Sequence, residues 1–166
     1  MNSRILSALT LLLVMLVTGV FWGTWFTLTR SLDVFPADNF IRIGKTIISN
    51  VAWPMRILMP ATLLTLLWLC LIAAKVRPSF YFFAGSFLLM LITLLITVMV
   101  EVPIDDQIKT WTVNTIPDNW TALRARWDTF HALRTFTSIL SFVALSIGVV
   151  FGNKNDALLH RRQKAI

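Results

Sequence analysis

The stretch "NWTALRARWDTFHALRTFTSILSFVALSIGVVFG", Asn119 to Gly152, decides the fold of this chain. Its second half, 132–151, is an apolar run long enough for a helix to cross a hydrocarbon core of about 30 Å. Its first half carries arginines and a histidine at helical spacing, after a helix-start signal at Pro117 and Asp118. We therefore expect one helix that is longer than a membrane is thick, with its first three turns outside the bilayer.

Three other runs are of similar length: 5–28, 57–74 and 80–100. Of the 166 residues, 57% are hydrophobic and only 14% are charged, whereas a soluble domain is typically about a quarter charged. The first run is longer than the apolar part of a signal peptide and has no A-x-A-like cleavage site, so we interpret it as a retained span. Cys70 is the only cysteine, which excludes an intramolecular disulfide. The sequence predicts an all-α, integral membrane four-helix bundle, with residues 1–166 forming a single domain.

The formal net charge of +7 is unevenly distributed along the chain. One side of the four spans holds a single acid, Asp156, and these basic residues: Arg4, Lys75, Arg77, Lys154, Arg161, Arg162 and Lys164. Positive charge beside span ends marks the cytoplasmic side. We therefore expect cytoplasmic termini, extracytoplasmic segments at 30–50 and 101–130, and a bacterial inner (plasma) membrane as the location. The basic excess then serves topology and contact with the lipid bilayer, and no nucleic-acid partner is expected.

Two long connections join the spans on the expected outer side, 29–56 and 101–128. Connections of this length in a compact domain usually have a function or contain structure of their own. In the first, Asp38 is a plausible N-cap, and Phe40, Ile41 and Ile48 follow at helical spacing. This pattern predicts a short amphipathic helix lying on the outer surface.

A polar and aromatic stripe runs along the helix that begins the fourth span. It comprises Trp120, Arg124, Trp127, His131, Arg134 and Ser138, which fall within a wedge of about 80°. An unpaired Arg134 facing lipid would cost a few kcal/mol, so the stripe should face the bundle interior. Glu101 and Asp105 follow the third run at matching depth, four residues apart. We therefore expect His131 and Arg134 to lie within hydrogen-bond or one-water reach of Glu101 or Asp105.

Other residues at this end have simpler interpretations. Trp22 and Trp53 are typical of the tryptophan belt at a membrane interface. Arg30 and Arg56 are typical of arginines whose side chains reach lipid headgroups or pair with acids.

The segment 101–134 resembles the signature of the anthrone oxygenase-like family of small four-helix membrane proteins. The matching residues are Val102, Pro103, Ile104, Trp111, Trp120, Leu123, Arg124, Arg126, Trp127, His131 and Arg134. Glu101 and Asp105 stand where the family pattern has asparagines, and an ionised carboxylate can only accept a hydrogen bond. The resemblance implies an oxygenase that converts an anthrone into an anthraquinone with molecular oxygen.

The leading functional hypothesis is a membrane oxidoreductase that acts on an aromatic or quinone-like hydrophobic molecule. The candidate catalytic residues are His131 as the base, Arg134, Glu101 and Asp105. The candidate substrate-binding residues are Trp120, Arg124, Trp127, Trp25 and Trp111, whose rings or charges suit flat anions.

Several alternatives stay open. The sequence identifies no cofactor, but a metal-dependent variant could use Glu101, Asp105, Asp128 and His131 as ligands. A non-catalytic membrane subunit could use the same pocket to bind a lipid, a small molecule or a partner protein, with the stripe acting as a buried salt-bridge network. An oligomer could form through the faces that carry Gly19 and Gly23, or Gly148 and Gly152.

Overall fold

The computed structural model describes the backbone of residues 3–74 and 77–163 and the side chains of residues 3–74 and 79–151. The element order is α1 (Ser3–Thr27), η1 (Thr29–Val34), α2 (Ala37–Ala73), α3 (Arg77–Ile96), η2 (Thr97–Glu101), α4 (Val102–Thr110) and α5 (Trp120–Gln163). The η1 segment is a 3₁₀ helix and η2 is a π turn. All regular secondary structure in the described part of the chain is helical, as the sequence predicts.

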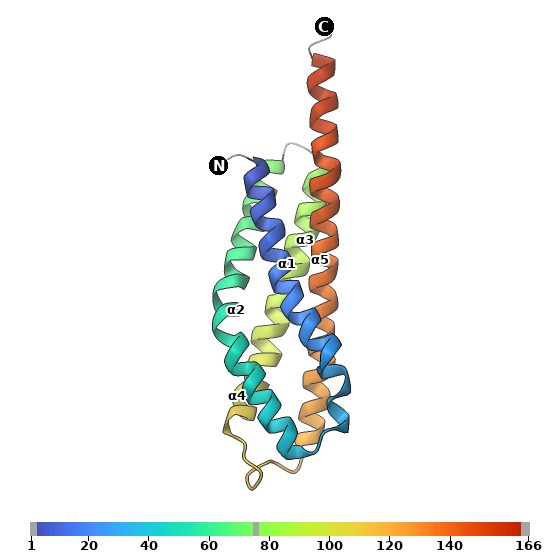
Figure 1. Ribbon diagram of the computed structural model, residues 1–166. Helices are drawn as coiled ribbons and strands as arrows, with labels where there is room; N and C mark the ends of the chain where they lie inside the picture. The colour runs from blue at the N-terminus through green and yellow to red at the C-terminus, as the bar shows by residue number, and fades with distance from the viewer. Residues whose placement is uncertain (1–2, 75–76, 164–166) are drawn as a thin grey trace.

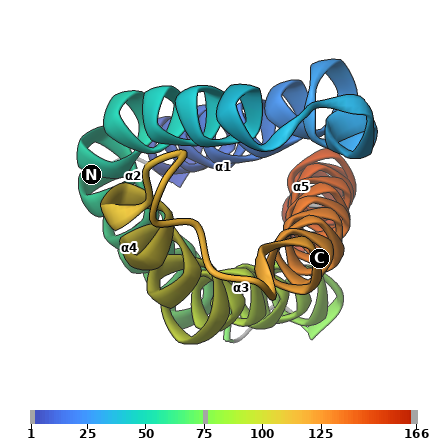
Figure 2. The same ribbon diagram turned by 90° about the horizontal axis from the view of Figure 1, so that it is seen from below.

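Four helical stretches in the described residues are long and apolar enough to cross a membrane: Ser3–Val34, Ala37–Ala73, Ser79–Thr110 and Trp120–Phe151. They lie side by side as an elongated bundle (Figure 1). Seen along its axis, the bundle is a ring in which α1 contacts α2 and α5, and α3 contacts the same two helices (Figure 2). Large apolar side chains are exposed along every one of these helices, as expected for an outer surface that faces lipid.

Small hydroxyl side chains join the helices inside the bundle. Ser86 Oγ and Ser141 Oγ are 3.0 Å apart, and Thr93 Oγ1 and Thr137 Oγ1 are 2.8 Å apart. Both pairs link α3 to α5. Interhelical hydrogen bonds of this kind, and close approach at small residues, stabilise helix packing in lipid because no hydrophobic force acts between helices there. They fix the mutual register of α3 and α5.

The first long connection differs from the prediction. The segment around Phe40 and Ile48 is not a separate surface helix, because α2 runs without a break from Ala37 to Ala73 and Pro36, rather than Asp38, occupies the N-cap position. Phe40, Ile41 and Ile48 are buried in a second apolar cluster with Ile108 of α4. Amphipathic spacing is the same whether the apolar face meets lipid or another helix, so sequence periodicity did not distinguish the two.

The second connection contains η2, α4 and a non-helical segment up to Asn119. α5 begins at Trp120, shortly after the predicted helix-start signal at Pro117 and Asp118, and how many of its first turns stand outside the bilayer stays a prediction. Both long connections lie at one end of the bundle, hereafter the α4 end, and the start of α1 lies at the other (Figure 1). Of the basic residues that predict a cytoplasmic side, only Arg4 has a described side chain, and the orientation stays a prediction.

The glycines of the two expected oligomer faces differ in their surroundings. A Cβ built on Gly148 would lie 2.7 Å from Phe83 Cε1, so Gly148 allows α3 and α5 to approach closely within the bundle. A Cβ on Gly19 or Gly23 would meet nothing within 4 Å. The surroundings of Gly152 lie outside the described side chains.

Candidate functional site

Two helix distortions face each other at the level of the candidate site. In α2, Pro54 and Pro60 both lie inside the helix, and each removes one backbone N–H from the helical hydrogen-bond ladder. In the opposite wall, the Val102 N–H donates to the Thr97 carbonyl, five residues back, and Pro103 then supplies no N–H. Such π turns occur frequently at functional sites. In both walls the regular i to i−4 hydrogen-bond pattern of the α-helix is therefore interrupted.

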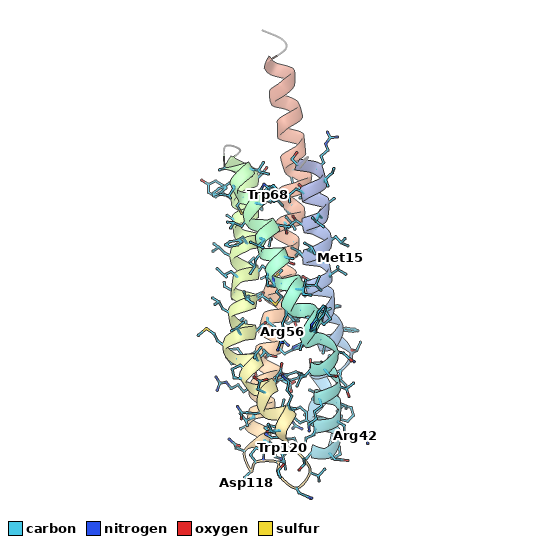
Figure 3. The ribbon with its side chains drawn as sticks, turned by 90° about the vertical axis from the view of Figure 1, so that its left-hand side faces the viewer. Met15, Arg42, Arg56, Trp68, Asp118 and Trp120 are labelled. Carbon is cyan, nitrogen blue, oxygen red and sulfur yellow. The ribbon has the colours of Figure 1, made fainter. Side chains whose placement is uncertain are left out.

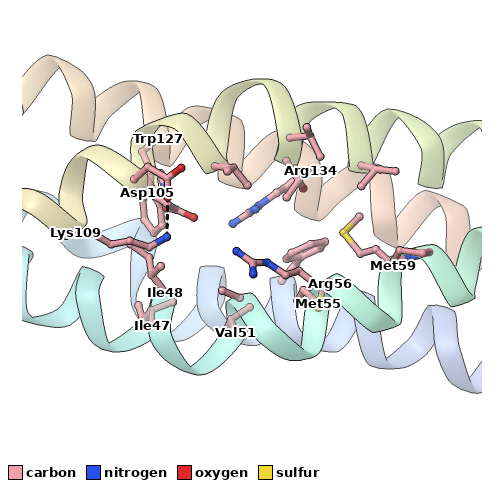
Figure 4. A pocket seen from close by; sticks show the side chains of 18 residues that line it. Ile47, Ile48, Val51, Met55, Arg56, Met59, Asp105, Lys109, Trp127 and Arg134 are labelled. Atoms are coloured by element: carbon pink, nitrogen blue, oxygen red, sulfur yellow. Dashed lines mark hydrogen bonds and ion pairs between the residues drawn. The ribbon is translucent and has the colours of Figure 1, made fainter.

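A cavity of about 340 Å³ lies between these two walls (Figure 4). Its polar lining consists of Arg56, Thr97, Asp105, Asp106, Lys109 and Arg134, with the indole of Trp127. Its apolar lining consists of Phe21, Ile47, Ile48, Val51, Ala52, Met55, Met59, Pro60, Leu94, Val98 and Val102. A mostly apolar cavity with a few convergent polar groups is typical of a small-molecule site.

Arg134 lines the cavity and is the centre of a buried polar network that extends behind the cavity wall. Its Nη2 lies 2.9 Å from Glu101 Oε2, which confirms the expected pairing with an acid of the third span. This contact is an ion pair rather than a hydrogen bond, so the attraction is between charges. Arg134 Nε donates to His131 Nδ1 at 3.1 Å, and its guanidinium carbon lies 4.6 Å from the centre of the Phe21 ring. The guanidinium is thus held from several directions.

These contacts define the state of His131. Arginine only donates, so Nδ1 accepts and the proton of a neutral imidazole lies on Nε2. His131 is 1% exposed, and its Nε2 has no hydrogen-bond partner among the described side chains and backbone. The ring stacks on Trp127 with centroids 5.3 Å apart, and Trp127 Nε1 donates to Asp105 Oδ1 at 3.0 Å. Trp127 therefore links the buried network to the cavity.

The structure separates the four candidate catalytic residues into two pairs. Arg134 and Asp105 line the cavity, whereas His131 and Glu101 are buried behind Arg134 and are absent from the cavity lining. Glu101 is fully buried, and its Oε1 has no hydrogen-bond partner among the described residues. His131 is buried although it precedes the predicted fourth span, because α4 and Trp127 extend the bundle interior beyond the predicted end of that span.

Of the candidate substrate-binding residues, only Trp127 lines the cavity. Arg124 Nη1 donates to the Leu32 carbonyl at 3.3 Å and its guanidinium stacks on Trp120, so it joins α5 to η1. Trp25 packs against the outer side of α5 at Phe136. Trp111 is buried in the apolar cluster near the α4 end. A helical wheel places such residues on a face but does not show how deep each side chain reaches.

The candidate metal ligands do not form one cluster. Within the described residues, no three His, Cys, Asp or Glu side chains are grouped so that they could hold a metal ion. Asp128 is partly buried, and its Oδ1 has no hydrogen-bond partner in the described part of the chain. The side chains present therefore do not fit a protein-bound metal centre.

Sequence reasoning missed three charged residues of the cavity. Arg56 was interpreted as a side chain that reaches headgroups or pairs with acids, and Asp106 and Lys109 were not singled out, yet all three line the cavity. Pro54 and Pro60 on either side of Arg56 could have indicated that α2 is distorted there. No sequence signal shows which way the exposed Arg56 turns.

Comparison with known protein families shows the family to which the chain belongs. The family model described as anthrone oxygenase matches residues 50–144, which is more than half of the chain. The chain belongs to the anthrone oxygenase family. Comparisons with curated proteins and with solved structures gave no match.

The matched region of this anthrone oxygenase family member contains nearly the whole cavity wall. Only Phe21, Ile47 and Ile48 of the lining lie outside residues 50–144. The resemblance deduced from the segment around Pro103 and His131 is confirmed at the level of the family. Residues from α2, η2, α4 and α5 meet at one place within the matched region, so the family relationship and the cavity concern the same part of the molecule.

Proposed function

We propose that this protein is a membrane oxygenase-like oxidoreductase that acts on an aromatic or quinone-like hydrophobic molecule at the extracytoplasmic edge of the membrane. The observation that carries the proposal is the cavity in which Asp105, Arg134 and the Trp127 indole meet a mostly apolar wall. The apolar wall suits a flat hydrophobic body. The two charged groups suit proton removal and anion stabilisation.

The proposed reaction oxidises an activated ring CH₂ to a ketone with O₂ and releases water. Asp105 accepts one proton from the CH₂, and Arg134 stabilises the resulting delocalised anion. The carbanion carbon then forms a C–O bond with O₂, which is reduced, and the terminal oxygen takes the proton back from Asp105. Loss of the second C–H proton with cleavage of the O–O bond leaves the C=O group and one water. Atoms and electrons balance with O₂ as the only oxidant.

His131 and Glu101 act as positioning residues in this proposal. His131 Nδ1 and Glu101 Oε2 both contact Arg134, and neither residue lines the cavity. We therefore assign proton acceptance to Asp105 rather than to His131. A guanidinium held before the reaction begins stabilises developing charge without reorganisation.

The test is oxidation of anthrone by the purified protein in lipid nanodiscs, followed as anthraquinone formation and O₂ uptake. Asp105→Asn keeps an acceptor for the Trp127 N–H and removes the base, so we expect a rate about 10²–10⁴-fold lower with an unchanged melting temperature. Asp118→Asn, an exposed acid outside the cavity, is the matched control. A rate no higher than in protein-free nanodiscs, or an Asp105→Asn variant as active as the wild type, would contradict the proposal.

The second candidate function is a non-catalytic subunit, and the buried Arg134–Glu101 pair favours it. A buried ion pair can fix helix register without any chemistry. In that case anthrone is not oxidised, and substitution of Arg134 abolishes assembly with a partner. Turnover by the isolated protein distinguishes the two functions.

A further inference from the structure

Arg56 is a positive charge on the cavity wall whose partner is missing from the described chain. It lies on α2 between Pro54 and Pro60, its side chain is exposed, and it lines the cavity. No ion pair or hydrogen bond joins it to any other residue in the part of the chain with described side chains. Along the bundle it lies between the levels of Trp68 and Arg42, within a helix that is apolar enough to span a membrane (Figure 3).

The other charges of the cavity have partners inside the protein. Lys109 Nζ pairs with Asp106 Oδ1 at 2.7 Å, and Arg134 pairs with Glu101. Among the described residues, no cation lies within ion-pair distance of Asp105. Asp105 Oδ1 instead accepts a hydrogen bond from Trp127 Nε1. Once Asp105 has taken a proton from a substrate, Arg56, which has no partner among the described side chains, is a cavity cation that can face the substrate anion beside Arg134.

The two guanidinium groups extend into the cavity from opposite walls, Arg56 from α2 and Arg134 from α5 (Figure 4). Arg134 is held by Glu101 and His131, whereas Arg56 has no such support. The cavity wall near Arg56 also includes the apolar side chains of Met55 and Met59. A flat ring system with an anionic oxygen at its edge matches this arrangement, because guanidinium forks bind carboxylate and similar oxygens and also stack on flat faces.

We propose that Arg56 and Arg134 together form an anion-binding pair, so that the substrate class is an aromatic molecule that bears a phenolate, enolate or carboxylate oxygen when bound. This inference rests on the proposed function for the site and names its substrate class. The proposed role of Arg56 differs from that of an ordinary membrane arginine, whose side chain reaches the phosphate headgroups of the lipid. A lipid phosphate offers similar chemistry, so the experiment separates the two sources.

The experiment measures binding without turnover, with a matched pair of ligands. Anthraquinone-2-carboxylate and the uncharged anthraquinone-2-carboxamide are titrated against protein in phosphatidylcholine nanodiscs, with quenching of tryptophan fluorescence as the signal. The variants are Arg56→Gln, Arg56→Lys and, as the control, Arg42→Gln, an exposed arginine of the same helix outside the cavity. Melting temperatures verify that each variant is folded.

The expected result is a loss of carboxylate affinity of about 10- to 100-fold in Arg56→Gln, the value of one charge-assisted hydrogen bond. Carboxamide affinity should stay within about 2-fold, Arg56→Lys should recover part of the loss, and Arg42→Gln should match the wild type. Equal effects on both ligands, or no effect on either, would overturn the proposal. The proposal would also be overturned if phosphatidylglycerol in the nanodiscs weakened carboxylate binding to the wild type but not to Arg56→Gln. The occupant of the Arg56 site would then be a lipid phosphate.

The same variants separate this inference from the proposed function. Charge-selective binding that depends on Arg56, without anthrone oxidation, would support the anion-binding pair and contradict the oxygenase function. Anthrone oxidation with charge-independent binding does the reverse.

Discussion

Arg134 Nη2 and Glu101 Oε2 lie 2.9 Å apart inside the bundle, where Glu101 is fully buried and Arg134 is 8% exposed. The pair joins α5 to the π turn that ends α3. Each charge is separated from water, so each depends on the other for compensation. This relationship connects the folding of the α4 end to the chemistry of the cavity.

Removing one member of this pair should destabilise the protein strongly. Glu101→Gln and Arg134→Met each leave one buried charge unpaired, which costs about 3–5 kcal/mol. The double variant Glu101→Leu with Arg134→Met should recover most of that loss, because apolar groups of similar volume often replace a buried pair without penalty. Unfolding of the purified proteins in mild detergent measures this. A double variant as unstable as the single variants would show that the loss of the ion pair is not the cause of their instability.

His131 should affect catalysis through the position of Arg134. His131→Leu keeps much of the volume and loses the acceptor for Arg134 Nε, whereas His131→Gln keeps an acceptor. The lost hydrogen bond comes from a charged guanidinium and is worth about 1.5–3 kcal/mol, which is less than the usual free energy of unfolding, so both variants should fold. We expect kcat to fall in His131→Leu and to be partly restored in His131→Gln, with little change in KM. Equal kcat values for the two variants would contradict a positioning role.

Gly148 should not tolerate a side chain. A Cβ there would lie 2.7 Å from Phe83 Cε1 and 3.0 Å from Phe82 Cβ. Gly148→Ala should therefore destabilise the bundle by about 1–3 kcal/mol through overpacking. Gly19→Ala is the matched control on an open face, and it should be neutral or slightly stabilising. The difference in melting temperature between the two variants is the measurement, and no difference would refute the close approach of α3 and α5.

The orientation of the chain can be tested with reporter fusions. We expect both termini in the cytoplasm, because the basic residues flank the spans on that side. A fusion after Ile166 to a reporter that is active only in the cytoplasm should be active. The same reporter inserted after Asn114, in the exposed segment between α4 and α5, should be inactive. The opposite pattern would place the cavity on the cytoplasmic side.

The sequence by itself determined the class of the fold and the family. Apolar runs such as 80–100 and 132–151 predict membrane helices because a bilayer accepts only segments whose backbone groups bond internally. The inward direction of Trp127, His131 and Arg134 also followed, because helical spacing and the cost of a charge in lipid leave one favourable face. The same argument predicted an acid beside Arg134, and Glu101 is that acid.

Only the tertiary structure decided which of these residues reach the cavity. Trp120 and Arg124 share a helix face with Arg134, but η1 and Phe40 cover them. Arg56 comes from another helix, and its place on the cavity wall depends on how α2 passes the π turn of α3. The periodicity of a sequence indicates only the direction in which a side chain leaves the axis of its own helix. Depth and neighbours depend on where helix distortions occur and how the helices are arranged, and these are set by contacts between residues far apart in the chain.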